Sequence, residues 1–239
     1  MSSPRPEVSL VFPAFNEAEG LGRAVEAALN ELRKVSSSFE IIIAEDGSSD
    51  GTDAVARRLS TAHPEVRHLH SAERLGRGRA LNMAFKENRG IILVYMDVDL
   101  ASDISQLRAL VDSIRGGADI VTGSRMLPGS RVKRSTRRSL ASWCYNSLIR
   151  LLFSTPVHDH QCGFKAFNRA RLMEYIDEVE DTHWFWDTEV LIKGVRRGLR
   201  VEEIPVEWSE GRGTKVRLFK DSWRMGSKAF HLWWRMRAN

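Results

Sequence analysis

The sequence predicts an α/β protein, built on a mostly parallel sheet that helices cover on both faces. In the first half of the chain, short β-branched runs alternate with segments of helical periodicity. Two of the runs, EIIIAE and IILVYM, have nearly continuous apolar centres, which is typical of strands buried on both faces. Strand–helix alternation of this kind favours parallel strands joined by helical crossovers.

The individual elements follow in chain order. We expect strands at residues 8–12, 39–44, 66–70, 91–96 and 119–122, which are short and mostly apolar. We expect helices between them at about 17–35, 50–62, 76–88 and 103–115. Residues suited to an N-cap, Ser48–Asp50 and Ser102–Asp103, precede the second and fourth of these helices. Beyond residue 124 we expect a basic loop at 124–138, helices within 139–153, 168–177 and 182–198, and a strand within 199–208.

Composition narrows the class of protein. The net charge of +5 and the pI of about 9.5 suit an anionic partner such as a phosphate, a lipid surface or nucleic acid. Because no recognised nucleic-acid-binding motif is present, we expect no nucleic-acid partner. Cys144 and Cys162 lie in unrelated contexts and predict no disulfide framework. No signal-peptide pattern or apolar run of about 20 residues is present, so we expect a cytoplasmic protein, soluble or peripheral at a membrane.

Acids and turn-forming residues follow three of the expected strands. The exits read PAFNE (13–17), EDGSSDGT (45–52) and DVD (97–99). Because sheets of this type bind ligands beyond the carboxyl ends of their strands, we expect these exits to converge on one ligand site. Helix capping explains any single exit equally well, but not the presence of three.

The third exit carries two carboxylates one residue apart, Asp97 and Asp99. Such close charges repel each other unless water or a cation compensates them. Oxygen ligands suit Mg²⁺ or Mn²⁺, which also accept substrate phosphates as ligands and neutralise a leaving phosphate. We therefore predict a divalent metal site at Asp97 and Asp99, with a solvated acidic loop as the alternative.

The order and spacing of the motifs resemble the family 2 glycosyltransferases of the GT-A, or nucleotide-diphospho-sugar transferase, fold. The motifs are VSLVFPAFNEAEGL, FEIIIAEDGSSDGT, ERLGRGRALNMAF, VYMDVDL, GSRMLPGS, DHQCGFKAF and the late GRGTK, and they span nearly the whole chain. The closest resemblance is to the dolichyl-phosphate glucose and mannose synthases. DHQCGFK and HWFWDTEVL favour the glucosyl branch, whereas GSRMLPGS is common to both. The resemblance implies inverting transfer of a hexose from UDP-glucose or GDP-mannose to a polyprenyl phosphate.

The resemblance also assigns roles to individual residues. It places Pro13, Phe15 and Glu17 in the nucleotide pocket, Ile43 and Glu45 near the base, and Asp97, Val98 and Asp99 at the nucleotide, sugar and metal. For Pro13 and Ile43, plain packing explains the residue equally well. Phosphate-binding positions of the family fall on Arg77, Arg125, Arg138, Arg212 and Lys215. Arg77 has the alternative of merely opening a helix, and the arginines of 131–138 that of ordinary surface charge.

The chemistry of the acceptor decides whether a general base is needed. A lipid phosphate is already an anion at neutral pH, so the protein needs cations to hold it rather than a base to activate it. Asp187 and Glu189 fall where relatives acting on hydroxyls carry a base, and they would take that role if the acceptor were a hydroxyl. A non-enzymatic nucleotide-binding scaffold is the remaining alternative. His158, Asp159, His160 and His183 are polar loop residues rather than a second metal site.

The C-terminal segment has the pattern of a helix lying in a membrane interface. Aromatic residues recur there at helical spacing beside lysines and arginines: Phe219, Trp223, Phe230, Trp233 and Trp234. We expect residues 1–215 to form the GT-A domain and residues 216–239 an amphipathic helix at the cytoplasmic face of a membrane. Residues 140–153 are a second candidate surface, for which packing on the core is equally plausible.

Overall fold

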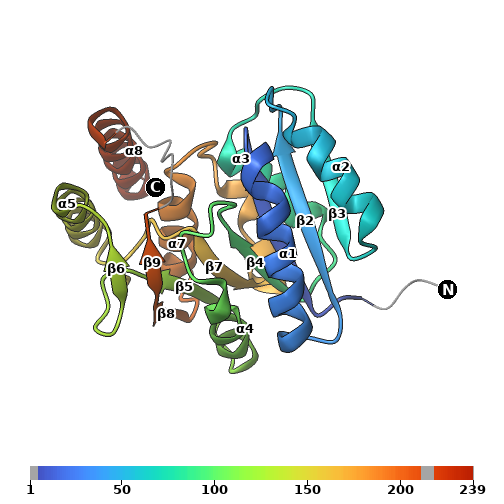
Figure 1. The fold of residues 1–239 in the computed structure, drawn as a ribbon. Helices are drawn as coiled ribbons and strands as arrows, with labels where there is room; N and C mark the ends of the chain where they lie inside the picture. Colours follow the sequence, from blue (N-terminus) through green and yellow to red (C-terminus); the bar gives the residue numbers. More distant parts are fainter. Residues whose placement is uncertain (1–4, 211–217, 239) are drawn as a thin grey trace.

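The computed structural model describes residues 5–210 and 218–238, except for the side chains of residues 218–223 and 238. One seven-stranded sheet dominates this described part of the chain, with strand order β3-β2-β1-β4-β7-β5-β8 (Figure 1). Its strands are β1 (Val8–Ala14), β2 (Phe39–Asp46), β3 (Val66–Ser71), β4 (Ile92–Met96), β5 (Ile120–Ser124), β7 (Phe164–Asn168) and β8 (Val201–Pro205). Only β7, antiparallel to β4 and to β5, departs from the parallel arrangement among these strands. The predicted α/β class is therefore confirmed.

Helices cover both faces of the sheet. On one face lie α1 (Ala18–Val35), α2 (Thr52–Ala62) and α4 (Leu107–Arg115), packed on the side chains of β1 and β2 that include Leu10 and Ile43. On the other face lie α3 (Arg77–Glu87), α6 (Arg169–Met173) and α7 (Trp186–Arg196). Alternate residues of each strand feed the two layers, because side chains of a strand point to opposite faces in turn.

A third apolar cluster lies outside these two layers. It joins α7 to α5 (Thr136–Phe153) and α8 (Leu218–Ala238), which lie side by side at one end of the molecule, away from α2 (Figure 1). Met225, Ala229 and Leu232 are the buried residues that α8 contributes. The expected C-terminal helix is therefore present, and one of its faces packs on the domain. In the described part of the chain, no helix is both long and apolar enough to cross a bilayer.

The structure differs from the expected elements mainly after residue 124. β7 was not among the expected strands, and it brings the DHQCGFKAF segment into the middle of the sheet. The basic run 124–138 contains a short strand, β6 (Arg131–Lys133), which pairs with β9 (Glu207–Ser209). The helix expected at 103–115 begins with a 3₁₀ turn, Ile104–Gln106. The expected strands and helices of residues 8–122 otherwise agree with β1 to β5 and α1 to α4 within a few residues.

Candidate active site

The exits of β1 and β2 are joined by hydrogen bonds beyond the carboxyl edge of the sheet. The amide of Asn16 donates to Ser48 Oγ (3.0 Å) and that of Glu17 to Thr52 Oγ1 (2.8 Å). In return, the amide of Ser49 donates to Asn16 Oδ1 (2.9 Å). The left-handed backbone of Asn16 (φ 54°) lets the loop turn toward its neighbour. PAFNE and EDGSSDGT thus form one wall of a shared site, as the parallel topology predicts.

The end of β2 also fixes the beginning of α3. The carboxylate of Asp46 accepts hydrogen bonds from the amides of Leu75 (2.6 Å) and Gly76 (2.9 Å). Gly76 has a φ of 101°, and a Cβ there would lie 2.3 Å from the carbonyl oxygen of Thr182. Only glycine therefore allows α3 to begin this close to the segment that precedes α7.

A cationic cavity of about 460 Å³ borders this wall. Arg74, which lines it, lies over the ring of Phe15 with 3.7 Å between its guanidinium carbon and the ring centroid. The lining residues come from the segment before α3, the segment before α7, and α8: Arg74, Leu75, His183, Trp184, Phe185, Arg224, Met225 and Lys228. A cavity with this many basic side chains suits an anionic ligand.

At the exit of β4, Asp97 is held from two sides. Its Oδ1 accepts hydrogen bonds from Arg77 Nη2 (2.8 Å) and Nε (3.2 Å), and its amide donates to the carbonyl of Gly163 (3.2 Å). A Cβ on Gly163 would lie only 1.9 Å from Asp97 Oδ2. The DHQCGFKAF segment therefore needs a glycine at this position to leave room for the carboxylate.

Asp99 remains more open to solvent than Asp97. Its Oδ1 accepts the amide of Ala101 (3.0 Å) across a turn in which Leu100 takes a left-handed backbone (φ 53°). Partial loss of water raises the pKa of Asp99, and the charges of Asp97 and Glu17 raise it further. The two carboxylates at the exit of β4, with Glu17 of the neighbouring β1 exit close enough to affect the pKa of Asp99, form an oxygen donor set that suits a hard divalent cation. Asp97 and Asp99 thus fit the predicted metal site, with Glu17 adding negative charge.

A buried polar network lies behind Asp97. Asp187 of α7 accepts hydrogen bonds from Arg77 Nη1 (2.7 Å), from Lys165 Nζ (2.7 Å) and from the hydroxyl of Tyr95. Lys165 is fully buried, and burial lowers its pKa to about 7. Burial likewise raises the pKa of Asp187 to about 6, against the attraction of Arg77. Arg77, predicted to touch phosphates or to open a helix, begins α3 and bridges Asp97 to Asp187.

The second acid of α7 is also occupied. Glu189 Oε2 accepts the amides of Glu180 (3.1 Å) and Asp181 (2.8 Å), and Oε1 pairs with Lys193 Nζ (2.9 Å). Glu189 is 4% exposed and Asp187 is 3% exposed. A general base must reach its substrate's proton with a free lone pair. In this arrangement both carboxylates are turned toward donors of the protein itself.

The predicted phosphate-binding arginines have different surroundings. Arg125 donates from Nε (2.7 Å) and Nη2 (2.9 Å) to the buried carboxylate of Asp159. This bidentate pair raises the pKa of Arg125 and lowers that of Asp159, despite burial. Arg138 pairs with Glu210. Arg212 and Lys215 lie outside the described residues.

One arginine of the basic run stands apart. Among the described residues, Arg134 has no carboxylate within ion-pair distance, and its Nε donates to Ser139 Oγ (3.1 Å). Burial lowers the pKa of Arg134, and the nearby Arg125 lowers it further. For every arginine of 131–138, ordinary surface charge is the alternative that the sequence leaves open. Nothing in their spacing distinguishes Arg134 from the other arginines of this run.

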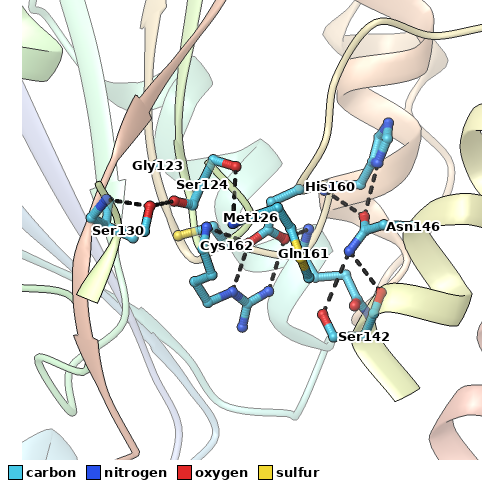
Figure 2. A network of polar contacts seen from close by, with 12 residues as sticks. Gly123, Ser124, Met126, Ser130, Ser142, Asn146, His160, Gln161 and Cys162 are labelled. Carbon is cyan, nitrogen blue, oxygen red and sulfur yellow. Dashed lines mark hydrogen bonds and ion pairs between the residues drawn. The ribbon is translucent and has the colours of Figure 1, made fainter. Parts of the chain in front are cut away.

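The segment around Asp159 is anchored to α5. The amide of His160 donates to Asn146 Oδ1 (2.9 Å), and the His160 Nδ1 lies 3.0 Å from the same oxygen (Figure 2). Burial lowers the pKa of His160 to about 3, so this imidazole is neutral. On the other side, the hydroxyl of Ser130 donates to the carbonyl of Ser124 (2.6 Å; Figure 2). These contacts hold the end of β5 and the DHQCGFKAF segment in a fixed relation.

The remaining predicted residues divide by burial. Ile43 is fully buried and Val98 is 2% exposed, and both pack in the core, so their side chains cannot reach a nucleotide. For Ile43 this agrees with the alternative named above, that the residue serves to pack the core rather than to contact the base. Pro13 is partly buried within β1. Both oxygens of Glu45 are occupied, Oε1 by the amide of Ser48 and Oε2 by His70 Nδ1, each at 2.5 Å.

The chain matches the sequence profile described as Glycosyl transferase family 2 over residues 9–176. It is 45% identical over 233 residues to the glycosyltransferase AglD of Haloferax volcanii, covering 96% of this chain but 37% of AglD. It is 29% identical to the dolichyl-phosphate beta-glucosyltransferase of Saccharomyces cerevisiae, covering 91% of this chain and 71% of that protein. This chain thus spans well under half the length of AglD.

The fold also matches a solved structure. Glucosyl-3-phosphoglycerate synthase from Mycobacterium tuberculosis, solved with Mn²⁺, UDP-glucose and phosphoglyceric acid, superposes with a TM-score of 0.68 at 18% identity. The match covers 94% of this chain and 77% of that one. At this identity the likeness concerns the fold. With the family match over more than half of the sequence, it leads to one conclusion: the chain belongs to glycosyltransferase family 2 and has the GT-A fold.

Proposed function

We propose that this protein transfers a hexose, glucose first and mannose second, from a nucleotide sugar to a polyprenyl phosphate, with inversion at the anomeric carbon. The observation that carries the proposal is the contrast between its two pairs of acids. Asp97 and Asp99 lie at the exit of β4 beside the β1 wall, whereas Asp187 and Glu189 are buried and fully engaged. Because neither acid of α7 has a carboxylate oxygen free to take a proton, we favour an acceptor that is already ionised.

On the donor side, the wall formed by the exits of β1 and β2 and the cationic cavity beside Phe15 would hold UDP-glucose or GDP-mannose. Mg²⁺ or Mn²⁺ held by Asp97 and Asp99 would neutralise the leaving nucleoside diphosphate. Arg77 fixes the orientation of Asp97, and Gly163 leaves space for its carboxylate. These residues pre-organise the donor rather than react with it.

On the acceptor side, the protein must hold a second anion near the first. Arg134 is the best placed described residue, because the largest influence of a charged neighbour on its pKa comes from another cation, Arg125. An anionic phosphate would relieve that repulsion and offer oxygens to the guanidinium fork. Arg125 and Arg138 would add positive potential, as would Arg212 of the GRGTK motif. The phosphate oxygen then attacks the anomeric carbon without losing a proton.

A lipid acceptor requires contact with a membrane, and α5 and α8 provide the apolar surface for it. Large exposed side chains on these two helices include Leu140, Trp143, Leu151, Phe230 and Trp234, each more than half exposed. Basic residues accompany them on α8, and each contributes roughly 1 kcal/mol near anionic lipid. We place this surface at the cytoplasmic face of a membrane.

The yeast relative is named for glucosyl transfer to dolichyl phosphate, which supports glucose as the first candidate. Mannose comes second because the GSRMLPGS motif is common to the glucose and mannose synthases. The assay is transfer of labelled hexose from UDP-glucose or GDP-mannose to a short polyprenyl phosphate, with and without EDTA. EDTA-sensitive formation of a hexosyl polyprenyl phosphate is expected. Donor binding without turnover would favour the scaffold, and transfer only to a hydroxyl would favour a base-dependent enzyme.

The membrane surface has its own test. Trp234→Glu changes an exposed residue of α8 (64% exposed) and should weaken binding to vesicles with anionic lipid without changing donor affinity. Ser227→Glu is the matched control, because it adds the same charge on the same exposed face of α8, seven residues earlier, and removes no aromatic ring. Equal loss of vesicle binding in the two variants would show that charge, rather than the aromatic surface, decides the contact.

A further inference from the structure

A second group of metal-ligand side chains lies at the opposite edge of the sheet from β8. Glu45 is the last residue but one of β2, His68 and His70 belong to the edge strand β3, and Asp53 lies in the first turn of α2. Residues two apart on a strand face the same way, so both histidines point toward the layer that α2 covers. Glu45 stands beside His70 in the register of β2 and β3.

The four side chains converge to the dimensions of a metal site. One ligand atom from each lies within 4.8 Å of the other three. Asp53 Oδ1 is 3.4 Å from His70 Nδ1 and 3.6 Å from His68 Nε2. Two ligands bound at about 2.1 Å to a tetrahedral ion are about 3.4 Å apart. The His70 Nδ1 and Glu45 Oε2 atoms, at 2.5 Å, need to separate by about 1 Å.

Two atoms of this cluster are buried and have no hydrogen-bond partner among the described residues: Asp53 Oδ1 and His68 Nε2. The side chain of His68 is only 9% exposed. Buried polar atoms are almost always paired, so two orphans that face each other require an explanation. Arg57 Nη2 donates to Asp53 Oδ2 (2.8 Å), which holds the carboxylate with its other oxygen directed at His68.

We propose that Glu45, Asp53, His68 and His70 bind one transition-metal ion, with Zn²⁺ as the expected occupant. Two imidazoles and two carboxylates in tetrahedral reach suit Zn²⁺, whereas Mg²⁺ requires oxygen ligands in octahedral geometry. His70 is 42% exposed, so the ion can enter from that side.

The ion would brace the donor side of the protein without touching the reacting atoms. It would join α2 to β2 and β3 at the two ends of the loop 47–51, whose Ser48 and Ser49 hold Asn16. Metal binding to the folded state alone raises stability, so the ion should also raise Tm. This inference is independent of the donor, the acceptor and the occupant of Asp97 and Asp99.

Co²⁺ spectroscopy tests the site directly. The full-length protein is stripped with EDTA, freed of chelator and titrated with Co²⁺ without nucleotide. Tetrahedral Co²⁺ absorbs visible light strongly, whereas octahedral Co²⁺ on carboxylates and water absorbs weakly. One equivalent should give the strong tetrahedral bands, Zn²⁺ should abolish them by displacement, and Zn²⁺ should raise Tm.

Variants assign the bands to residues. His68→Gln and Asp53→Asn should each abolish the bands and the Zn²⁺-dependent rise in Tm. Asp99→Ala and His63→Gln should keep both, since His63 follows α2 and pairs with Glu26 away from the cluster. Asp53 is 30% exposed, so Asp53→Asn remains informative if His68→Gln fails to fold. The inference is overturned if no tetrahedral bands form, if they survive both cluster substitutions, or if Asp99→Ala removes them.

Discussion

The protein carries two pairs of acids that look alike in sequence and differ in their surroundings. Asp97 and Asp99 follow a strand and lie one residue apart, and burial and mutual repulsion raise the pKa of Asp99. Asp187 and Glu189 have the same spacing on a helix, but lysines, Arg77 and backbone amides occupy their oxygens. Arg77 contacts both pairs, but Asp99 has no cation within ion-pair distance in the described part of the chain, whereas both acids of the second pair do. We therefore expect a cation at Asp97 and Asp99 and none at Asp187 and Glu189.

The largest expected effect tests the first pair, Asp97 and Asp99. Asp99→Ala should lower hexose transfer by about a thousandfold, because several kcal/mol of charge stabilisation would be lost with the cation. Its fold, followed by circular dichroism, should be unchanged. Asp112→Ala is the control, since Asp112 is a surface acid of α4 with a 49% exposed side chain. Wild-type transfer by Asp99→Ala would refute the metal assignment.

Substitutions in the second pair, Asp187 and Glu189, should lower the stability of the fold. Asp187→Ala leaves Lys165 buried without its carboxylate, and breaking such a pair costs about 3–5 kcal/mol of unfolding free energy. Urea unfolding measures this loss. Asp177→Ala removes an exposed acid paired with Lys86 and should cost less than about 1 kcal/mol.

A double variant sharpens this test. Asp187→Leu combined with Lys165→Met removes both buried charges and should recover much of the lost stability. If the double variant is no more stable than Asp187→Ala, the cost does not come from an uncompensated charge.

Gly163 directly precedes β7 and lies against the carboxylate of Asp97. Gly163→Ala would place a Cβ where Asp97 Oδ2 lies, so the carboxylate must move and transfer should fall about tenfold. Gly22→Ala in α1 is the matched control, because a Cβ there meets no atom within 4 Å. Steady-state transfer kinetics compare the two variants. Equal activity would mean that Asp97 tolerates displacement.

The smallest expected effect concerns the charge of Asp99 itself. Because the folded-state pKa of Asp99 is raised, its ionised form costs stability at neutral pH. In EDTA-treated protein, Asp99→Asn should raise Tm by about 1–2 °C at pH 7.5, since solvent screens an exposed group. The gain should vanish as pH falls through the folded-state pKa and the wild-type carboxylate becomes protonated. A gain that persists at low pH would exclude charge repulsion as its cause.

The first half of the fold can be predicted from sequence because its strands are short and apolar. A segment with the apolar periodicity of a helix separates each strand from the next. β7 is different, because FKAFN carries a lysine that normally indicates a solvent-exposed face. Lys165 is instead buried against Tyr95 and Asp187, which come from β4 and α7. The alternation Phe164-Lys165-Ala166-Phe167 is the available signal, yet it does not identify the partners that neutralise a buried charge.

The candidate site shows the same limit. The motif residues Asp97 and Asp99 and the strand exits could be placed from topology alone, because parallel strands end at one edge. The pairing of Arg125 with Asp159 depends on contacts between segments that are distant in sequence. The cluster of Glu45, Asp53, His68 and His70 was not predicted for the same reason, since its residues come from β2, α2 and β3. Sequence spacing alone could not bring them together.

The proposed reaction uses an acceptor that arrives as an anion and needs no base from the protein. Comparing hexose transfer to a short polyprenyl phosphate with transfer to the alcohol of the same chain length tests this most directly. We expect turnover with the phosphate and none with the alcohol, in wild-type protein saturated with donor and divalent metal. Comparable turnover with the alcohol would contradict it, because a hydroxyl needs the free base that neither Asp187 nor Glu189 provides.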